Sequence, residues 1–350
     1  MNIRLITTIL AGIAITCCSC RKPATDLSHE DETHTKEAEC MVSFEKSGNT
    51  EHFNVAVKDE FRKNIWFVFR INHYTNHSGL YYMDLWRIDW AYQGKFDENT
   101  GEMTNILDKI ITNGENESVF KDYGENYNTS GQTHTDTYDF TGGFHGDERI
   151  DLDKDCGVTF FIGNDPVGEE MMKKSFGWTK CDKFSYTQIS TMHKTALKKD
   201  GQPVESDHHI VARHLKTTTF GKGGYKTENT LEMKDEIDFY WYFGICCIGR
   251  NVAEMGYNED MKPVHFDASG VNRLEGIGKR EYCAWSDTNS IEVHVKSSLT
   301  HGGDDKVSKM HIWDNQNYAK YYRRYPASGA HRTSEGEKFS SVMEVRFICR

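Results

Sequence analysis

The sequence predicts an all-β fold, and two observations carry that prediction. Aromatic and β-branched residues recur in short bursts that are separated by Gly, Asn and Asp, a pattern typical of strands joined by turns. Several bursts also alternate strictly: in Ile291–Lys296 the apolar side chains fall on one face and the polar side chains on the other, as in a half-buried strand. Helical periodicity is weak, and only Asn105–Thr112 and Gly168–Lys174 could form a few helical turns.

The expected strands are long and rich in aromatic residues. Such strands favour a jelly roll or concanavalin-like sandwich of two large antiparallel sheets. A β-propeller is the alternative, but the sequence shows no repeat at the length of a propeller blade. The segments expected as strands are Glu51–Val57, Ile65–Ile71, Leu80–Ala91, Val158–Ile162, His209–Phe220, Ile237–Ile248, Ser290–Val295 and Met343–Ile348.

The N-terminus has the form of an export signal. A short basic start, Met1–Arg4, precedes the apolar run Leu5–Ile15, which is shorter than the roughly 20 residues of a transmembrane helix. A small residue before a cysteine, directly after such a run, resembles the lipobox of bacterial lipoproteins. The resemblance implies cleavage and lipidation at Cys18, with Cys17 and Cys20 as competing positions. An ordinary cleaved signal peptide is the alternative.

The expected domain organisation is simple. Residues 1–20 form the signal peptide, residues 21–39 an acidic, polar tether, and residues 40–350 a single β-sandwich domain. The tether contains too few apolar side chains to offset the entropy of ordering it. An acidic tether after a lipidated cysteine resembles surface lipoproteins of the Bacteroidota, which implies a lipid-anchored protein of the outer membrane, exposed at the cell surface.

Composition excludes some classes of partner. A formal net charge of −11 argues against a protein whose role is to bind nucleic acid, so membrane contact is expected through the lipid anchor alone. The cysteines that follow the signal segment form no C-x-x-C pair, which argues against a zinc knuckle. Seven of the ten cysteines follow the signal segment, and this odd number leaves at least one thiol unpaired; we expect mostly free cysteines.

The first candidate site is the glycine-rich stretch Gly142–Glu148, which contains His145 and Glu148 in an H-x-x-E arrangement. The stretch resembles the metal-binding turn of zinc carboxypeptidases, and that resemblance implies a zinc hydrolase. Without a metal, the glycine pair would let a ligand approach the backbone while His145 and Glu148 present polar groups to it. A turn whose side chains only satisfy backbone groups is the third interpretation.

Three further stretches carry residues suited to an acidic sugar. His209 and Arg213 fall on one face of an expected strand, where arginine would bind a carboxylate and histidine would exchange a proton. Tyr240 and Tyr242 likewise share a face and are suited to stack on a sugar ring, or to pack as core. The run Asn315–Tyr325 resembles the late strand of alginate-lyase-like jelly rolls; the residues concerned are Tyr318, Tyr322 and Arg324.

These residues together predict a polysaccharide lyase that cleaves a uronic-acid polymer by β-elimination and needs no cofactor or metal. In this reaction one group neutralises the uronate carboxylate, a base removes the C5 proton, and an acid protonates the leaving oxygen. A non-catalytic glycan-binding lipoprotein and a zinc hydrolase built on His145 and Glu148 are the alternatives. The expected catalytic residues are His145, His209, Arg213, Tyr240 and Tyr242, and the expected substrate-binding residues are Glu148, Tyr318, Tyr322 and Arg324.

Overall fold

The computed structural model describes most of the chain after residue 38. The chain divides into two compact units, Met1–Glu37 and Ala38–Arg350, and the first unit, with Cys18, lies outside the described residues. No helix in the described part has the length and apolar character needed to cross a membrane. The described residues are 39–76, 83–112, 119–122, 140–141, 148–193, 198–199, 202–203, 210–221, 223–236, 238–249, 254–257, 264–265, 271–277, 281–286, 291–304, 308–315, 319–326 and 331–349.

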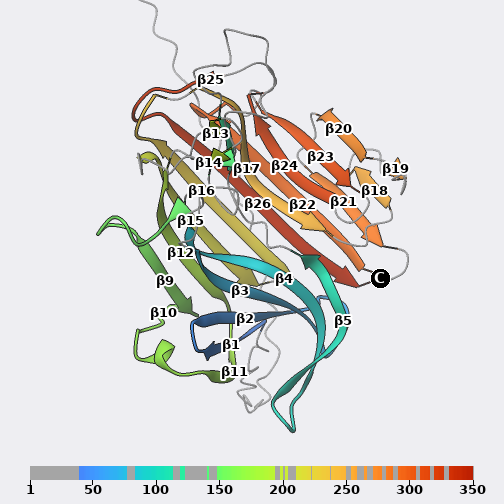
Figure 1. Ribbon diagram of the computed structural model, residues 1–350. Coiled ribbons are helices and arrows are strands. Elements are labelled where there is room, and N and C mark those ends of the chain that lie inside the picture. The colour runs from blue at the N-terminus through green and yellow to red at the C-terminus, as the bar shows by residue number, and fades with distance from the viewer. Residues whose placement is uncertain are drawn as a thin grey trace, which may run out of the picture. The chain divides into compact units, whose positions relative to one another are not determined.

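The all-β prediction is confirmed. Apart from one 3-10 turn, η3 (Met171–Lys173), every regular element in the described ranges is a strand (Figure 1). The strands of the first half are β1 (Cys40–Ser47), β2 (Thr50–Lys58), β3 (Ile65–Asn76), β4 (Met83–Asp97), β5 (Glu102–Thr112), β6 (Val119–Asp122), β7 (Phe140–Thr141), β8 (Glu148–Arg149), β9 (Gly157–Ile162), β10 (Asp165–Pro166), β11 (Phe176–Cys181), β12 (Phe184–His193), β13 (Lys198–Lys199) and β14 (Gln202–Pro203).

The second half continues with long strands. They are β15 (Ile210–Gly221), β16 (Gly224–Met233), β17 (Asp238–Gly249), β18 (Glu254–Tyr257), β19 (Val264–His265), β20 (Val271–Ile277), β21 (Glu281–Ser286), β22 (Ile291–His301), β23 (Lys309–Asn315), β24 (Ala319–Tyr325), β25 (His331–Arg332) and β26 (Lys338–Cys349).

One large sheet forms both layers of a sandwich. The first layer is the antiparallel series β11-β1-β2-β3-β4, and β5 extends β4. The second layer is the antiparallel series β9-β12-β15-β16-β26-β22-β21-β18-β19. The short strand β8 links the layers because it pairs parallel with β4 and antiparallel with β12.

The main core fills the space between these two layers. Every contributing strand buries alternate residues toward it, as the period of a strand requires. Phe53 is at its centre, with ring centroids 4.5 Å from Phe160 and 5.2 Å from Phe184. Each aromatic side chain buried in this way stabilises the fold by roughly 1.5–3 kcal/mol. The core draws on both layers, from Val42, Phe69 and Trp86 in one to Tyr225, Val295 and Phe347 in the other.

A second sheet covers the far end of the long strands. Its strand order is β20-β23-β24-β17-β6-β7, and β25 also pairs with β17. Tyr242 of β17 and Tyr325 of β24 pack in a second apolar cluster with residues from five strands of the larger sheet, including Leu231, Leu299 and Phe339. On the inner face of the second layer, the long strands therefore pack against the main core at one end and against the second apolar cluster at the other.

The predicted strands agree well with the observed strands, but the two predicted helical turns do not. Asn105–Thr112 lies within β5, which pairs with β4 from Phe96↔Met103 onward. Pairing satisfies the backbone groups of β4 along this edge, which outweighs the weak local helical preference. Gly168–Lys174 forms only the single turn η3.

The described cysteines have free thiols, in agreement with the prediction of mostly free cysteines; they are Cys40, Cys156, Cys181 and Cys349. Cys40 and Cys181 are directly opposite each other on β1 and β11. The hydrogen bond between their side chains, together with burial, raises the pKa of Cys40, and the same hydrogen bond lowers the pKa of Cys181.

Candidate functional site

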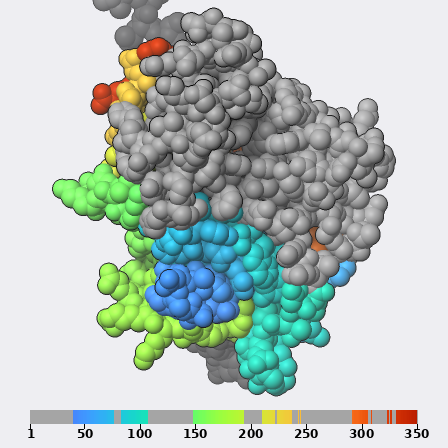
Figure 2. Space-filling model, viewed as in Figure 1, coloured from blue at the N-terminus to red at the C-terminus, as the bar shows by residue number. Residues whose placement is uncertain are grey.

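A row of polar side chains crosses the outer face of the first layer, the face opposite the main core. His52 on β2 is directly opposite Asn72 on β3, and Asn72 is directly opposite Arg87 on β4. Directly opposed residues of antiparallel strands project from the same face. We call this group, together with Tyr74 and Arg70, the outer-face cluster. Figure 2 shows that the blue-to-teal chain of β1–β5 forms part of the molecular surface.

Aromatic rings support both arginines of the cluster. The Arg70 guanidinium carbon lies 4.3 Å from the centroid of the Trp90 ring, and that of Arg87 lies 4.9 Å from the Tyr74 ring. Arg70 Nε also donates a hydrogen bond to Asn54 Oδ1 at 3.3 Å. Its other guanidinium N–H groups have no partner among the described residues, so they are placed to bind an anion.

A β-bulge in β4 adds a carboxylate to this face. Arg70 pairs with Trp90 but Ile71 pairs with Ile88, so Asp89 is the extra residue between them. Bulges are common beside functional sites because they redirect a side chain. Here Asp89 Oδ2 accepts a hydrogen bond from Asn72 Nδ2 at 2.7 Å, and Asp89 Oδ1 lies 3.9 Å from Arg87 Nη2.

His52 is prepared to act as a base. Burial, and then the positive charge of Arg70, lower the pKa of His52 below 6.5, so its imidazole is neutral at pH 7. Nε2 is buried and has no hydrogen-bond partner within the described chain. Glu45 Oε2 lies 3.4 Å from Nε2 and raises the pKa of His52, but burial and Arg70 outweigh it. A neutral imidazole can accept a proton on the ring nitrogen that carries its lone pair.

Tyr74 has the properties of a proton donor. Burial, and then a hydrogen bond to Asp89, raise the pKa of Tyr74 above 10, so the phenol carries its proton at neutral pH. Asn72 Nδ2 donates to its hydroxyl oxygen at 3.4 Å. A neutral base and a protonated phenol therefore flank Asn72 on one sheet face.

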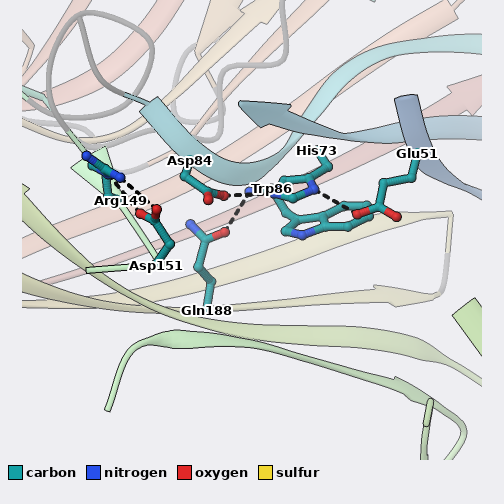
Figure 3. A network of polar contacts seen from close by, with 7 residues as sticks. All are labelled: Glu51, His73, Asp84, Trp86, Arg149, Asp151 and Gln188. Atoms are coloured by element: carbon teal, nitrogen blue, oxygen red, sulfur yellow. Dashed lines mark hydrogen bonds and ion pairs between the residues drawn. The ribbon is translucent and has the colours of Figure 1, made fainter. Parts of the chain in front are cut away.

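Behind this face, a histidine clamp fixes the three strands to one another (Figure 3). His73 Nδ1 donates to Glu51 Oε1 and His73 Nε2 donates to Asp84 Oδ1, both at 2.8 Å. Its ring stacks on Trp86 at 4.7 Å, and Trp86 N donates to Gln188 Oε1 at 2.7 Å. Burial alone would lower the pKa of His73, but Asp84 and Glu51 outweigh it and raise the pKa above 6.5.

Of the predicted residues, Glu148 lies at the centre of a different, fully buried network. Its Oε1 accepts hydrogen bonds from Ser190 Oγ at 2.6 Å and from His214 Nδ1 at 2.8 Å. Asn229 Nδ2 donates to His214 Nε2 at 3.1 Å. Burial would raise the pKa of Glu148, but His214, then Lys216 and Ser190, lower it to about 2.

This network belongs to a polar band between the two apolar clusters. Along the inner face of the second layer, Gln188, Lys216, Asn229 and Ser341 are directly opposite one another across four strands. All four are 4% exposed or less. Because the band is internal and Asn229 bonds to both His214 and Ser341, it has the character of a structural element.

The structure does not bring Arg213 and Tyr242 together as predicted. Arg213 projects from β15 on the face opposite His214, and its Nη2 donates to the carbonyl oxygen of Asp155 at 3.0 Å. Tyr242 is fully buried in the second apolar cluster, so it packs as a core residue. The two side chains share no surface.

The other predicted residues are placed only in part. Tyr240 lies on β17, and Tyr322 and Arg324 lie on β24. His145, His209 and Tyr318 lie outside the described residues. The zinc hydrolase alternative rests on His145 and Glu148, and the Glu148 carboxylate is already engaged by Ser190 and His214.

Sequence reasoning missed the outer-face cluster, although a signal was present. In the run from Arg70 to Tyr74, Arg, Asn and Tyr alternate with Ile and His, so three functional side chain types share one face of a single strand. The residues of β2 and β4 that lie beside this face depend on the register between the strands, and the register cannot be read from the sequence.

No protein-family model matches the chain, and no curated protein does. Several solved structures resemble it distantly, among them the following two. The galactosidase domain of alpha-galactosidase-sucrose kinase AgaSK has a TM-score of 0.40 and 7% identity over 82% of this chain, which spans 41% of that structure. The Slr1438 protein from Synechocystis sp. PCC 6803 has a TM-score of 0.32 and 8% identity over 87% of this chain and 97% of that one. At these TM-scores neither structure informs the function.

Proposed function

We propose that the chain is a polysaccharide lyase that cleaves a uronic-acid polymer at the outer-face cluster. The observation that carries the proposal is the row formed by His52, Asn72 and Tyr74 beside Arg70. It combines the residue types that β-elimination needs on one face of two adjacent strands, β2 and β3.

Each residue has a distinct role in this reaction. The Arg70 guanidinium binds the uronate carboxylate and withdraws charge from it, which acidifies the proton at C5. Asn72 Nδ2 donates to Asp89 Oδ2 and to Tyr74 Oη, so its role is to position the phenol. His52 Nε2 takes that proton, the released electron pair forms the C4–C5 double bond, and the C4–O4 bond breaks. Tyr74 Oη gives its proton to the departing O4. Proton exchange with water then restores both side chains.

The cluster also explains why the substrate should be a sugar acid. Trp90 lies under Arg70 and its ring centroid is 5.2 Å from that of Tyr92. Aromatic rings bind the apolar faces of sugars, while the arginine selects a carboxylate. A neutral polysaccharide would leave the guanidinium without its anion.

The test incubates the protein with a panel of acidic polysaccharides and measures turnover as the ultraviolet absorbance of the unsaturated uronic-acid ends that form. We expect His52→Ala to lower kcat by about 10²- to 10⁴-fold, the usual contribution of a general base. Arg70→Lys keeps the positive charge but loses the planar guanidinium that can bind a carboxylate with two hydrogen bonds, so it should raise KM and lower kcat. The matched control is His294→Ala, because His294 is also a partly exposed strand histidine beside a glutamate, with Nε2 2.9 Å from Glu292 Oε2.

Two outcomes would contradict the proposal. Full turnover by folded His52→Ala would remove the base from the mechanism. Binding of acidic glycans without turnover by the wild type would instead identify a glycan-binding protein that uses the same arginine and aromatic surface.

We further propose that the protein is exported and lipid-anchored through Cys18, at the outer membrane and cell surface. This proposal rests on the N-terminal sequence alone. Radiolabelled fatty acid should be incorporated by the wild type and lost in a Cys18→Ala variant. Label that persists when Cys17, Cys18 and Cys20 are all replaced would overturn it.

A further inference from the structure

Two histidines and a glutamate converge where four strands end. His301 is the last residue of β22, His331 is the first of β25, and Glu337 directly precedes β26. Glu337 Oε1 lies 2.5 Å from His301 Nε2 and 2.6 Å from His331 Nε2. One ligand-type atom from each of the three lies within 4.8 Å of the others.

A tyrosine holds the opposite edges of both imidazole rings. Tyr325 Oη, at the end of β24, lies 3.0 Å from His301 Nδ1 and 3.2 Å from His331 Nδ1. Phe339 forms an apolar floor, with its ring stacked on His301 at 4.8 Å. The rings are therefore held on one side by packing and on both edges by polar contacts.

With neutral rings, these four side chains have one hydrogen too few for all of their polar contacts, so an additional proton or a metal ion is needed. If both Nε2 atoms donate to Glu337 and both rings are neutral, neither Nδ1 carries a proton, yet Tyr325 has only one hydroxyl proton to give to two acceptors. The contacts are all favourable if one ring is an imidazolium. They are equally favourable if a metal ion replaces both Nε2 protons.

The metal-bound arrangement needs no charged imidazole. With a cation on both Nε2 atoms, each neutral ring carries its proton on Nδ1, and both Nδ1–H groups donate to the two lone pairs of Tyr325 Oη. Histidines that bind metals almost always donate their other N–H to an oxygen in this way. One tyrosine would then orient two ligands at once.

We propose that His301, His331 and Glu337 bind a divalent cation of the zinc type. Two imidazole nitrogens and one carboxylate oxygen form the ligand set of open zinc sites, in which a water or substrate atom takes the remaining position. Zinc bond lengths of about 2.0–2.2 Å place tetrahedral ligands about 3.3 Å apart. The two Nε2–Oε1 distances would have to open by less than about 1 Å.

The site is accessible to solvent and separate from the outer-face cluster. The three ligand side chains are 26%, 23% and 14% exposed, in the order His301, His331, Glu337. An ion there can be reached from solution, and its open position suits water or an anionic group. Glu337 Oε2 accepts a hydrogen bond from Ser334 N at 2.8 Å, which leaves Oε1 directed at the histidines.

The experiment uses the full purified chain, stripped with a chelator, titrated with Zn²⁺ and analysed for bound metal after desalting. We expect the wild type to hold one equivalent of zinc more than His301→Ala or the isosteric Glu337→Gln. Tyr325→Phe should keep that equivalent but bind it about 10- to 100-fold more weakly, because it loses the acceptor for both rings. His294→Ala is the control and should bind like the wild type.

A second probe makes the result independent of other zinc sites in the chain. Co²⁺ bound by two imidazoles and a carboxylate should give visible absorption bands that Glu337→Gln removes. Circular dichroism checks that each variant is folded. Equal zinc content and equal Co²⁺ spectra in the wild type and folded Glu337→Gln would overturn the proposal and leave a proton-bridged ion pair.

Discussion

The buried network around Glu148 and the outer-face cluster around His52 use similar side chains in opposite ways. In the buried network both ring nitrogens of His214 bond to other strands: Nδ1 to Glu148 of β8 and Nε2 to Asn229 of β16. On the outer face, His52 Nε2 has no hydrogen-bond partner among the described residues, and the side chain is 15% exposed. A histidine whose nitrogens are both satisfied holds strands together, whereas a neutral histidine with a nitrogen that makes no hydrogen bond can still exchange a proton.

The physical reason lies in what each environment does to charge. At Glu148 the nearby His214, Lys216 and Ser190 outweigh burial and hold the pKa at about 2, so the carboxylate remains an acceptor. At His52 burial and Arg70 act in the same direction and keep the ring neutral. The inner band therefore has the character of a structural element, and the outer face is where we propose the reaction.

The largest expected effect is on folding. Glu148→Ala removes the shared acceptor of Ser190 and His214, and breaking a buried pair in this way typically costs about 3–5 kcal/mol of unfolding free energy. Urea denaturation measures it. Glu232→Ala is the control, since Glu232 pairs with Lys234 and Lys338 near the surface and should cost less than about 1 kcal/mol. A Glu148→Ala loss as small as that of the control would contradict the structural role of the band.

A smaller effect, of about 1 kcal/mol, is expected at the clamp behind the outer face. The folded pKa of His73 is raised, so its bonds to Asp84 and Glu51 contribute fully below pH 6.5 and lose their contribution as the pH rises through the folded pKa. The difference in unfolding free energy between the wild type and His73→Gln should therefore shrink from mildly acidic to alkaline pH. A difference that grows with pH would show that the clamp does not work through the imidazolium.

The contrast also bears on the two proposed sites. The outer-face cluster lies within three paired strands, where the ladder fixes each side chain. The His301–His331–Glu337 group lies at strand ends, where turns bring together residues from three separate elements. Gly302 and Gly303 follow His301 with φ of 58° and 84°, so glycine allows β22 to end in a tight turn.

The sequence determined the class of fold, and much of the strand assignment followed from it. Ile65–Ile71 and Val158–Ile162 appear in β3 and β9 because period-2 alternation depends on local sequence and burial. The sequence also led us to expect histidine, arginine and tyrosine on one sheet face. Arg213 lies on the face opposite His214, as strand alternation predicts, but Tyr242 packs in a core and His209 lies outside the described residues.

Only the tertiary structure decided which strands are neighbours. His52, Asn72 and Arg87 are adjacent because β2, β3 and β4 pair in one register, and shifting any of them by one residue would turn its side chains to the other face. His301, His331 and Glu337 meet because β22, β25 and β26 end at the same place. Alternation along a strand is a local property that a sequence displays, but register and the meeting of strand ends arise from burial of the whole core.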